Sequence, residues 1–399
     1  MNTTAILITD DTSALTTATE LAAGFRKGAA ERDARRRLPH AELDRLSASG
    51  LLGVTVPAAF GGADVRTETL AEIFRLLAAA DASLAQIPQS HFVYVHVLRQ
   101  QGSPAQQEFF FREVLAGKRF GNAQSEAGTT HVQDIRARLT RRPDGWYDLD
   151  GVKHYSTGAL FADWIPVLAR TDDDTLHVAY VPRDAPGLTV VDDWDGMGQR
   201  TTASGSVRLA SVPVPADRVV PHHLTFEGPQ LHGAVAQLLH AAIDTGIAAG
   251  ALAEAVEFVR TKSRPWFESV AEGHGTAAED PLLIQRFGEL AIQVRAAEAL
   301  LAAAARSVDT ARADLTDDTA AEASIAVAAA KVTAGTAALE VSSALFEVSG
   351  TRSALDSLGL NRHWRDARTH TLHDPARWKV QHIGRHVLNG TRPPRHGLL

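Results

Sequence analysis

The chain has 399 residues, of which 45% are hydrophobic and 22% charged, and its formal net charge at pH 7 is −7. An acidic balance argues against a nucleic-acid surface, which needs a basic excess. The absence of cysteine excludes disulfides, thiolate metal sites and a cysteine nucleophile. The N-terminal run "MNTTAILITDDTS" has only four consecutive apolar residues, too few for a signal peptide, and no later stretch reads as a membrane span. We therefore expect a cytoplasmic protein of two or three domains that binds neither nucleic acid nor a membrane.

The first part of the chain has a helical period. Between residues 14 and about 117, apolar residues recur three and four positions apart, as in Leu70, Phe74 and Leu77, and prolines and glycines interrupt the pattern. This pattern predicts a first domain made of helices.

The pattern changes near residue 118. Turn sequences such as Pro-Asp-Gly and Asp-Gly separate short runs of strand-forming residues. The clearest runs lie at 176–181, 188–191 and 206–214, and the last alternates apolar and polar residues as a half-buried strand does. Six or more such strands before residue 218 predict a small all-β module.

From about residue 227 the period is helical again, and alanine is frequent. One expected apolar stripe consists of Phe287, Leu290, Val294 and Leu301, and a second consists of Ile325, Ala328, Val332, Leu339 and Phe346. Gly246, Gly250 and Ala253 place small residues on one face, where another helix can approach closely. The last part is predicted to be a set of long packed helices.

One charged segment near the end, "RHWRDARTHTLHDPARWK" (362–379), holds three histidines. It fits a solvated helix end, a metal site or acid–base machinery. His370 and His373 are three positions apart and would share a helix face. No third ligand pattern accompanies them, and with 17 histidines in the chain such pairs arise by chance, so metal binding is the weakest interpretation.

Four segments, in order, resemble the acyl-CoA dehydrogenase family. "RRRLPHAELDRLSASGLLGVTVPAAFGG" (35–62) resembles its N-terminal helix pair. "SEAGTTHVQ" (125–133) and "KHYSTGALFADWIPVLART" (153–171) resemble its two flavin-contacting segments. "RDARTHTLHDP" (365–375) resembles the segment that closes the active site. The resemblance covers nearly the whole chain.

The resemblance implies an α+β fold in three domains. It implies an N-terminal all-α domain over residues 1–117, a central small β-barrel over 118–218 and a C-terminal four-helix bundle over 219–399. Family members pair through the C-terminal helices, so we expect a homo-oligomer, most simply a homotetramer.

The resemblance also implies which residues hold a flavin. Tyr155 and Thr157 match residues that lie against the flavin ring, where a hydroxyl can hydrogen-bond the N5 edge. Ser125 matches a hydroxyl residue on the first segment. Arg260 matches an arginine that reaches a flavin phosphate across a subunit contact, which its fork of donors suits. Without the resemblance, a Tyr-Ser-Thr run is ordinarily only a strand and a surface arginine is ordinarily solvated.

The residues at the expected base positions argue against dehydrogenation. The usual family glutamate, in a Tyr-Glu-Gly run, aligns with Asp374, whose side chain is one methylene shorter. Pro375, with its fixed φ, stands in place of the glycine. A second base position used by some members falls at about Ala236, and the nearest carboxylate there is Asp244, two turns further along.

The altered residues resemble the flavin monooxygenase branch, which includes dibenzothiophene monooxygenase and the sulfur-acquisition oxidoreductases. That branch takes reduced FMN from a separate reductase, forms a C4a-(hydro)peroxide with O2 and oxygenates a small organosulfur compound. The chemistry needs a group that manages a proton near neutral pH, which histidine does. We expect His373 to fill this role first and His370 second. His91 matches a pocket histidine of this branch, and Asp374 is the neighbouring carboxylate.

Several alternatives stay open at this point. An acyl-CoA dehydrogenase would use Asp374 as its base, and a nitrogen-hydroxylating relative would oxygenate an amine. A scaffold without flavin is the third class, against which Tyr155, Thr157 and Arg260 argue. FMN is expected, with FAD as the second choice. "GMGQRT" (196–201) lacks the third glycine of a dinucleotide fingerprint and reads as a loop, so no docking site for NADH is expected.

Overall fold

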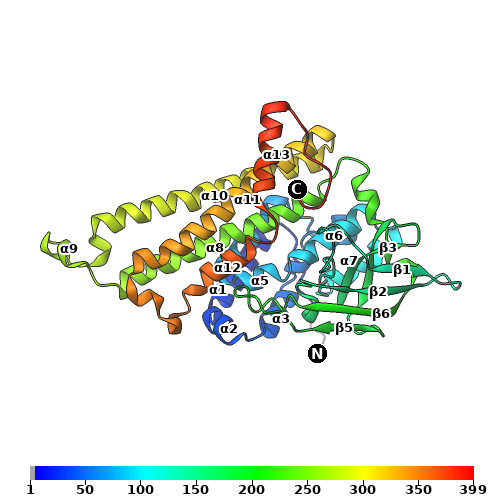
Figure 1. The fold of residues 1–399 in the computed structure, drawn as a ribbon, viewed down its shortest axis with the longest axis horizontal. Coiled ribbons are helices and arrows are strands. Elements are labelled where there is room, and N and C mark those ends of the chain that lie inside the picture. Colours follow the sequence, from blue (N-terminus) through cyan, green and yellow to red (C-terminus); the bar gives the residue numbers. More distant parts are fainter. Residues whose placement is uncertain (1–4) are drawn as a thin grey trace.

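The computed structural model describes residues 5–399 and shows helices, then a sheet, then helices along the chain (Figure 1). The N-terminal helices are α1 (Asp11–Arg26), α2 (Ala29–Arg35), α3 (His40–Ala48), α4 (Thr67–Ala80), α5 (Ala82–Gln86), α6 (Gln89–Gln101) and α7 (Pro104–Leu115). The strands are β1 (Arg138–Arg141), β2 (Tyr147–Lys153), β3 (Trp164–Thr171), β4 (Leu176–Pro182), β5 (Leu188–Val191), β6 (Ser206–Val214) and β7 (Val219–Val220). The C-terminal helices are α8 (His232–Lys262), α9 (Phe267–Ala271), α10 (Pro281–Ala313), α11 (Asp317–Ser349), α12 (Asn361–His370) and α13 (Ala376–Asn389).

The seven strands form one sheet in the order β5-β6-β2-β1-β3-β4-β7. Each neighbouring pair is antiparallel except β1 and β3, which run parallel. Leu149 on β2 lies opposite Val212 on β6, and both are fully buried. The edge strands β5 and β7 do not hydrogen-bond to each other within the described residues, so the predicted barrel is a sheet with two edges.

Helices α6 and α7 pack on this sheet through aromatic side chains. The rings of Phe110 and Tyr180 lie 4.6 Å apart, a close aromatic contact of the kind that stabilises a core beyond simple burial. The hydroxyl of Tyr180 on β4 donates a hydrogen bond of 2.8 Å to the backbone oxygen of Tyr94 on α6. These contacts fix the start of α6 relative to the sheet.

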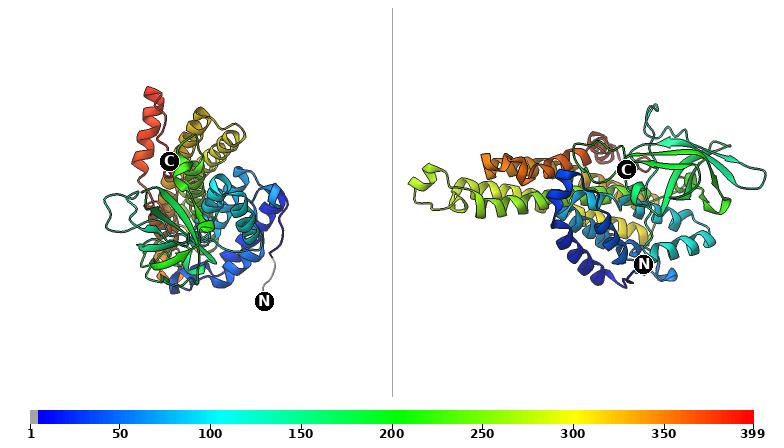
Figure 2. Two further views of the ribbon diagram at one scale, coloured as in Figure 1. Left: turned by 90° about the vertical axis from the view of Figure 1, so that its right-hand side faces the viewer. Right: turned by 90° about the horizontal axis from the view of Figure 1, so that it is seen from below.

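The long helices α8, α10 and α11 run side by side and extend beyond the other parts of the molecule (Figure 2). The predicted stripe on α10 is confirmed at Leu290, Val294 and Leu301, which are buried, and Phe287 is half-buried against the same core. The predicted stripe on α11 is confirmed only at Ala328, which is buried, and its larger residues are half-buried, namely Ile325, Val332, Leu339 and Phe346. The fully buried face consists mainly of alanines and valines, because the small side chains let α8 and α11 approach closely.

Helix α8 is the central helix and also contacts the N-terminal helices. A Cβ atom at Gly246 would lie 2.5 Å from the backbone oxygen of Arg75 on α4, and one at Gly250 would lie 2.6 Å from that of Ala79. Both glycines are therefore required for the close packing of these two helices, as predicted. The third small residue, Ala253, is exposed and takes no part in it.

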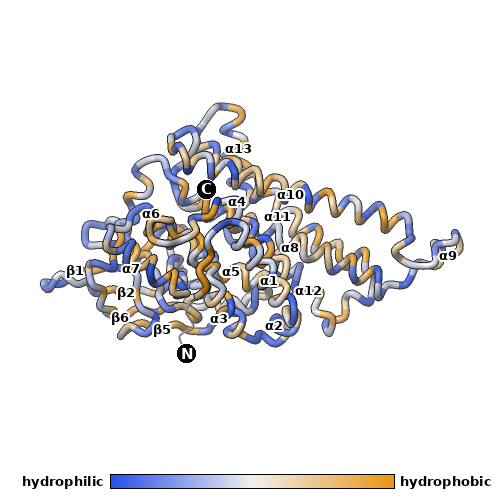
Figure 3. The backbone as a smooth tube through the Cα atoms, turned by 180° about the vertical axis from the view of Figure 1, so that it is seen from behind, coloured by the Kyte–Doolittle hydropathy of each residue, from blue (hydrophilic) through white to orange (hydrophobic). Residues whose placement is uncertain are grey.

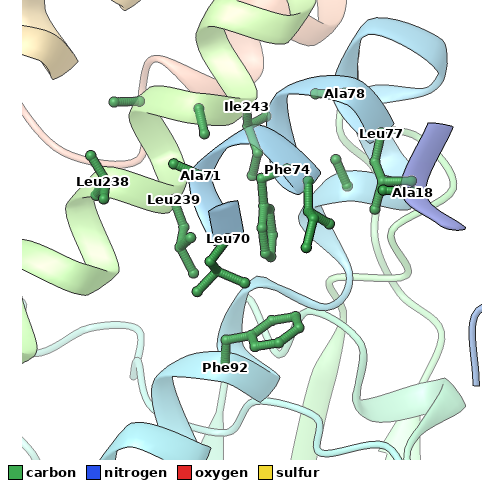
Figure 4. Close-up of a cluster of buried hydrophobic side chains, with 14 of the residues drawn as sticks. Ala18, Leu70, Ala71, Phe74, Leu77, Ala78, Phe92, Leu238, Leu239 and Ile243 are labelled. Carbon is green, nitrogen blue, oxygen red and sulfur yellow. The ribbon is translucent and has the colours of Figure 1, made fainter. Parts of the chain in front are cut away.

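The largest hydrophobic core joins the N-terminal helices to α8. Phe74 and Leu70 on α4 pack with Leu239 and Ile243 on α8, and Phe92 on α6 closes the cluster (Figure 4). Deleting a large buried side chain such as that of Phe74 costs about 3–5 kcal/mol of stability. Segments of hydrophobic residues accordingly lie in the interior of the helical part, and hydrophilic segments lie at the outer turns (Figure 3).

Two helices reach the length and hydropathy of a membrane span, contrary to the reading of the sequence. They are α8 and α11. In α8, 89% of the relevant window is buried inside the protein. Its apolar character is explained by its central place in the core.

Candidate active site

Three parts of the chain meet where the sheet module faces the start of α6. Gly158 follows the segment 155–157 with φ +77°, and a Cβ atom there would lie 3.0 Å from the backbone oxygen of Ile87. The Nε2 atom of Gln89, the first residue of α6, donates to the backbone oxygen of Ala236 on α8 over 3.2 Å. Segment 155–157, α6 and α8 are thus held against one another.

A chain of hydroxyl groups begins at Thr157. Its Oγ1 atom lies 2.7 Å from the Oγ atom of Ser204, which lies 2.7 Å from the Oγ1 atom of Thr202. Thr202 donates its proton to the backbone oxygen of Gln199 over 3.0 Å. Because each hydroxyl has one proton, Ser204 then donates to Thr202 and Thr157 donates to Ser204. Thr157 is left with a lone pair and acts as an acceptor toward any further ligand.

The residues beside this hydroxyl fit a flavin ring. Tyr155 has φ +55°, and its side chain is 62% exposed next to Trp194. The buried hydroxyl of Ser156 has no hydrogen-bond partner within residues 5–399. Ser125 lies beside this segment, because its backbone oxygen accepts from the N–H of His154 over 2.9 Å. An exposed aromatic face next to unpaired hydroxyl oxygens suits a planar, polar-edged ring.

Helix α12 is tied to the same module by hydrogen bonds at Arg365 and Asp366, and Arg365 donates to the backbone oxygen of Met197 at 2.8 Å. The backbone N–H of Gln199 donates to the Oδ1 atom of Asp366 over 2.5 Å. His370 lies one turn after Asp366 on α12. The loop that ends the hydroxyl chain therefore also positions the histidine-bearing helix.

Two of the predicted residues lie in a buried line of polar contacts. The Nδ1 atom of His370 lies 2.5 Å from the Oδ1 atom of Asp244 on α8. Its Nε2 atom lies 3.0 Å from the Nδ1 atom of His240, one turn earlier on α8 than Asp244. The ring of His240 stacks on that of His373 with centroids 3.9 Å apart. Lys331 on α11 donates to Asp244 over 2.9 Å.

The turn after α12 presents His373 to solvent and buries Asp374. The side chain of His373 is 41% exposed, and its Nδ1 atom lies 3.4 Å from the Oδ2 atom of Asp374. The other oxygen of Asp374 lies 3.1 Å from the Nζ atom of Lys379 on α13. Pro375 cannot extend α12, and it restricts the residue before it to an extended backbone.

The charges of this cluster follow from its surroundings. Burial alone would raise the pKa of Asp374, but the hydrogen bond from His373 and the charges of Lys331 and Lys379 lower it. Burial would likewise raise the pKa of Asp244, and the charges of its two cationic neighbours lower it. Both carboxylates are therefore ionised. Burial lowers the pKa of His370 in spite of the neighbouring carboxylate.

His91 lies outside this cluster. Its Nε2 atom lies 3.0 Å from the backbone oxygen of Leu52, and its Nδ1 atom accepts from the backbone N–H of Phe120 over 3.1 Å. Burial lowers the pKa of His91 to about 4. The neutral ring thus joins α6 to two other segments, and neither nitrogen is available for another partner.

Arg260 is far from the cluster along α8. It lies twenty positions after His240 on one helix, which places the two about 30 Å apart. The side chain is exposed and has no ion-pair partner within the described chain. Arg260 therefore cannot reach a ligand at the histidine cluster of its own subunit.

The remaining histidine of the charged segment has a structural contact. The Nε2 atom of His363 lies 3.0 Å from a carboxylate oxygen of Glu254 on α8. No group of three or more histidine, aspartate or glutamate side chains in residues 5–399 is arranged to hold a metal ion.

Sequence profiles of one family match most of the chain. "Acyl-CoA dehydrogenase, N-terminal domain" matches residues 11–118, "Acyl-CoA dehydrogenase, middle domain" matches 121–212 and "Acyl-CoA dehydrogenase, C-terminal domain" matches 238–378. The chain belongs to the acyl-CoA dehydrogenase family.

Individual members of this family narrow the assignment. Dibenzothiophene monooxygenase of Rhodococcus erythropolis is 36% identical, over 96% of this chain and 95% of its own. The probable FMNH2-dependent monooxygenase SfnC of Pseudomonas putida is 34% identical, over 95% of this chain and 96% of its own. The crystal structure of FMN-bound TdsC from Paenibacillus sp. A11-2 superposes with a TM-score of 0.91 at 35% identity and covers 97% of this chain and 100% of that one. The chain belongs to the flavin-dependent monooxygenase branch of the acyl-CoA dehydrogenase family.

The predicted fold and branch are thus confirmed, and the structure adds residues that the sequence analysis did not assign. His240, Lys379 and Ser204 each contact a predicted site residue, and Lys331 contacts Asp244, the partner of His370. His240 has one sequence signal, a polar residue on an alanine-rich helix at the spacing of a turn from Asp244. Lys331 and Asp244 are 87 residues apart, too far for the sequence to show their contact, whereas Lys379 lies close to Asp374 in the sequence and could have been considered.

Proposed function

We propose that this monooxygenase is the oxygenase component of a two-component system in sulfur acquisition. It takes reduced FMN from a separate flavin reductase and uses O2 to transfer one oxygen atom to a small organosulfur compound. The bound reduced flavin supplies electrons and activates O2 at its C4a carbon. The names of two relatives support this assignment, since one acts on dibenzothiophene and the other is described as FMNH2-dependent.

The state of Asp374 is the observation that carries the proposal. A dehydrogenase needs a carboxylate basic enough to remove a proton from carbon. Asp374 is buried and bonded to His373 and Lys379, which lower its pKa and make it a weak base. The group that the turn exposes is instead the imidazole of His373. An imidazole exchanges protons near neutral pH, as oxygen transfer requires.

The roles of the other histidines follow from their partners. His373 is the group that exchanges a proton with the reacting molecule, and Asp374 orients it. His370 is buried with both nitrogens occupied, so it acts through His240 rather than by direct contact. His91 holds α6 in place through two backbone contacts.

The hydroxyl chain supports binding of the reduced cofactor. With Thr157 facing the N5 edge of the ring, its free lone pair accepts a hydrogen bond from the N5–H group that only reduced flavin has. The N5 atom of oxidised flavin is itself a hydrogen-bond acceptor, so it would face the lone pair of Thr157 without a proton between them. Tyr155 and Ser125 complete the contact with the ring. FMN, rather than FAD, is the cofactor we propose, because TdsC is described as FMN-bound.

We assign reduction of the flavin to a separate reductase, because the one segment that resembles a dinucleotide fingerprint has another role in the described residues. The segment 196–201 is the loop that supports Asp366 and the hydroxyl chain. We place both components in the cytoplasm, where reduced flavin passes between them by diffusion.

We also propose a homotetramer. Arg260 lies about 30 Å from its own site, so its guanidinium serves the flavin phosphate of a neighbouring subunit. Large apolar side chains are exposed on α10 and α13, and such faces mark protein contacts. They are Leu282, Ile284, Ile292 and Leu300 on α10 and Trp378, Val380, Val387 and Leu388 on α13.

The deciding experiment supplies the protein with FMN, NADH and a flavin reductase. It offers a sulfinate, a sulfone, a thioether, a thiophene and an amine under 18O2. We expect one 18O atom in a sulfur product. Oxygenation of the amine alone would identify a nitrogen-hydroxylating enzyme, and bleaching of bound flavin by an acyl-CoA thioester would identify a dehydrogenase.

A further inference from the structure

The contacts of Asp244, His370 and His240 determine where their protons lie. Asp244 is ionised, so the Nδ1 atom of His370 carries the proton that it donates to this carboxylate. A neutral His370 then accepts at Nε2, and the Nδ1–H group of His240 is the donor. The Nε2 atom of His240 is left with a lone pair, because the ring's hydrogen bond within residues 5–399 is made at Nδ1.

We propose that His240, His370 and Asp244 form a buried proton store that receives a proton at the Nε2 atom of His240 and holds the charge on His370. The proposal rests on the proposed function, since it gives the oxygen-transfer reaction a second proton acceptor beside His373. His240 is the group that meets the incoming proton, and Asp244 is a positioning residue.

The proton transfer takes two steps, and each N–H bond that breaks is matched by one that forms. An N–H bond forms at the Nε2 atom of His240 as the donor loses its proton. The Nδ1–H bond of His240 breaks, and an N–H bond forms at the Nε2 atom of His370. His240 ends neutral, and His370 ends as an imidazolium that donates to Asp244. No oxidant or reductant takes part.

The charged groups around the proton store determine how favourable this transfer is. Asp244 stabilises the imidazolium form of His370 by direct contact at a distance of 2.5 Å. Lys331 is bound to the other oxygen of Asp244 and disfavours it. His373 stacks on His240, and Asp374 and Lys379 form an ion pair behind it that adds no net charge.

A purely structural role accounts poorly for this arrangement. His240 and Asp244 lie on a helix whose other buried residues are almost all apolar, and Asp244 is completely buried. Burying a carboxylate and two imidazoles costs free energy that an apolar residue at the same positions would not cost. Their alignment as successive hydrogen-bond donors and acceptors allows a proton to pass between them.

The proton store can be observed without flavin. We would label the histidines with 15N and follow His240 and His370 by NMR from pH 5 to pH 9 in the protein as purified. We expect both rings to respond to one shared titration. Asp244→Asn removes the stabilising carboxylate and should lower the midpoint of this shared titration by at least one pH unit. Lys331→Met removes the opposing charge and should raise the midpoint.

The opposite signs separate the proposal from simple loss of packing, which would move both variants in the same direction. His240→Asn keeps a donor toward His370 but cannot relay a proton, so the titration of His370 should disappear from the range. His232→Asn, a buried histidine on the same helix with no contact to the line, is the matched control and should leave the midpoint unchanged. Independent titration of His240 and His370, or equal shifts in Asp244→Asn and Lys331→Met, would overturn the proposal.

A second readout links the store to turnover. The pH optimum of oxygen transfer should move down in Asp244→Asn and up in Lys331→Met, in step with the NMR midpoints. A pH optimum that is the same in the wild type and in both variants would contradict a role for the proton store in catalysis. If the wild-type protein oxygenates no compound at all, the proposed function fails, and the NMR titration still decides whether the store exists.

Discussion

The carboxyl group of Asp366 on α12 accepts a hydrogen bond of 2.5 Å from the backbone N–H of Gln199 in the sheet module. Gln199 has φ +47°, and its backbone oxygen accepts the proton of Thr202 at the end of the hydroxyl chain. One buried side chain therefore joins the helix that bears His370 to the loop behind Thr157. Both halves of the site depend on this contact.

Burial of the Asp366 carboxyl group should make the protein less stable as the pH rises, although the hydrogen bond from Gln199 opposes this effect. Burial and the charges of Asp33 and Asp81 raise the pKa of Asp366 to about 7, above the value of 3.8 expected in the unfolded chain. The folded state binds the proton more tightly, so this contribution is full below about pH 4 and is lost as the pH rises to about 7. Asp366→Asn keeps the acceptor without a charge. We expect its free energy of unfolding at pH 8 to exceed that of the wild type by about 1–4 kcal/mol.

Denaturant unfolding of both proteins from pH 4 to pH 8 measures this difference. The two curves should coincide at pH 4 and separate above it. A variant that is less stable than the wild type at pH 8 would mean that the ionised carboxylate stabilises the fold through the N–H of Gln199 and the charge of Arg365.

His373→Ala should uncouple oxygen consumption from product formation. The variant should still bind reduced FMN and consume O2, because those steps do not need the imidazole. Product formation should fall by about 10²–10⁴-fold, the usual effect of losing one acid–base group. The missing oxygen should appear as hydrogen peroxide, which a peroxidase-coupled assay detects alongside the product.

The order of the neighbouring variants tests the assignment further. His370→Ala should have a milder effect than His373→Ala, and Asp374→Asn should lie between them. His386→Ala, at a half-buried position on α13 outside the cluster, is the control. A dehydrogenase would reverse this order, with Asp374→Asn the most damaging change. Full coupling in His373→Ala would remove that residue from the mechanism.

Thr202→Val should weaken the preference for reduced flavin. Without the proton of Thr202 on Gln199, the hydroxyls of Ser204 and Thr157 are free to turn, and Thr157 can donate to oxidised flavin. One hydrogen bond exchanged in this way changes the ratio of the two Kd values by about 5–20-fold. Anaerobic and aerobic fluorescence titrations with FMN give both Kd values.

The matched control for that variant is Thr189→Val, at an exposed position on β5. It removes the same hydroxyl from the same sheet and should leave the ratio unchanged. Equal ratios in the wild type and Thr202→Val would show that the hydroxyl chain does not select the redox state.

Arg260→Ala should weaken FMN binding while the oligomer stays intact. Loss of one arginine–phosphate contact should raise the Kd of FMN by about 10–100-fold. Arg295→Ala, an exposed arginine on α10, is the control for the loss of positive charge. Light scattering measures the oligomer in each case. A protein that is a monomer and yet binds FMN at full strength would refute the shared site.

Much of the fold could be predicted because local patterns determine it. The runs at 188–191 and 206–214 are β5 and β6 residue for residue, since strand alternation and flanking turns are visible in the sequence. The stripe on α11 was misplaced because its core face consists of alanines, while the larger residues that attract notice lie at its flanks. The domain boundaries at 117/118 and 218/219 stay predictions.

The site was predictable only where the family resemblance reached. The roles of His373, Thr157 and Arg260 rested on it and stay proposals. His240 and His370 are 130 residues apart and meet because α12 packs on α8, a fact that no short-range pattern contains. The two backbone contacts of His91 likewise depend on segments from elsewhere in the chain.

The glycine contacts of α8 bear on how the substrate range of this enzyme can be changed. Gly246 and Gly250 bring the backbone of α8 against that of α4, so no side chain between them can be trimmed or enlarged to shift the helix. The wall of the site that α8 forms is therefore rigid. Variant libraries that aim at bulkier or smaller sulfur compounds should leave α8 alone. They should vary instead residues 371–372 of the turn, leaving His373 in place, and the loop at 127–133, where the chain can absorb new shapes without disturbing the core.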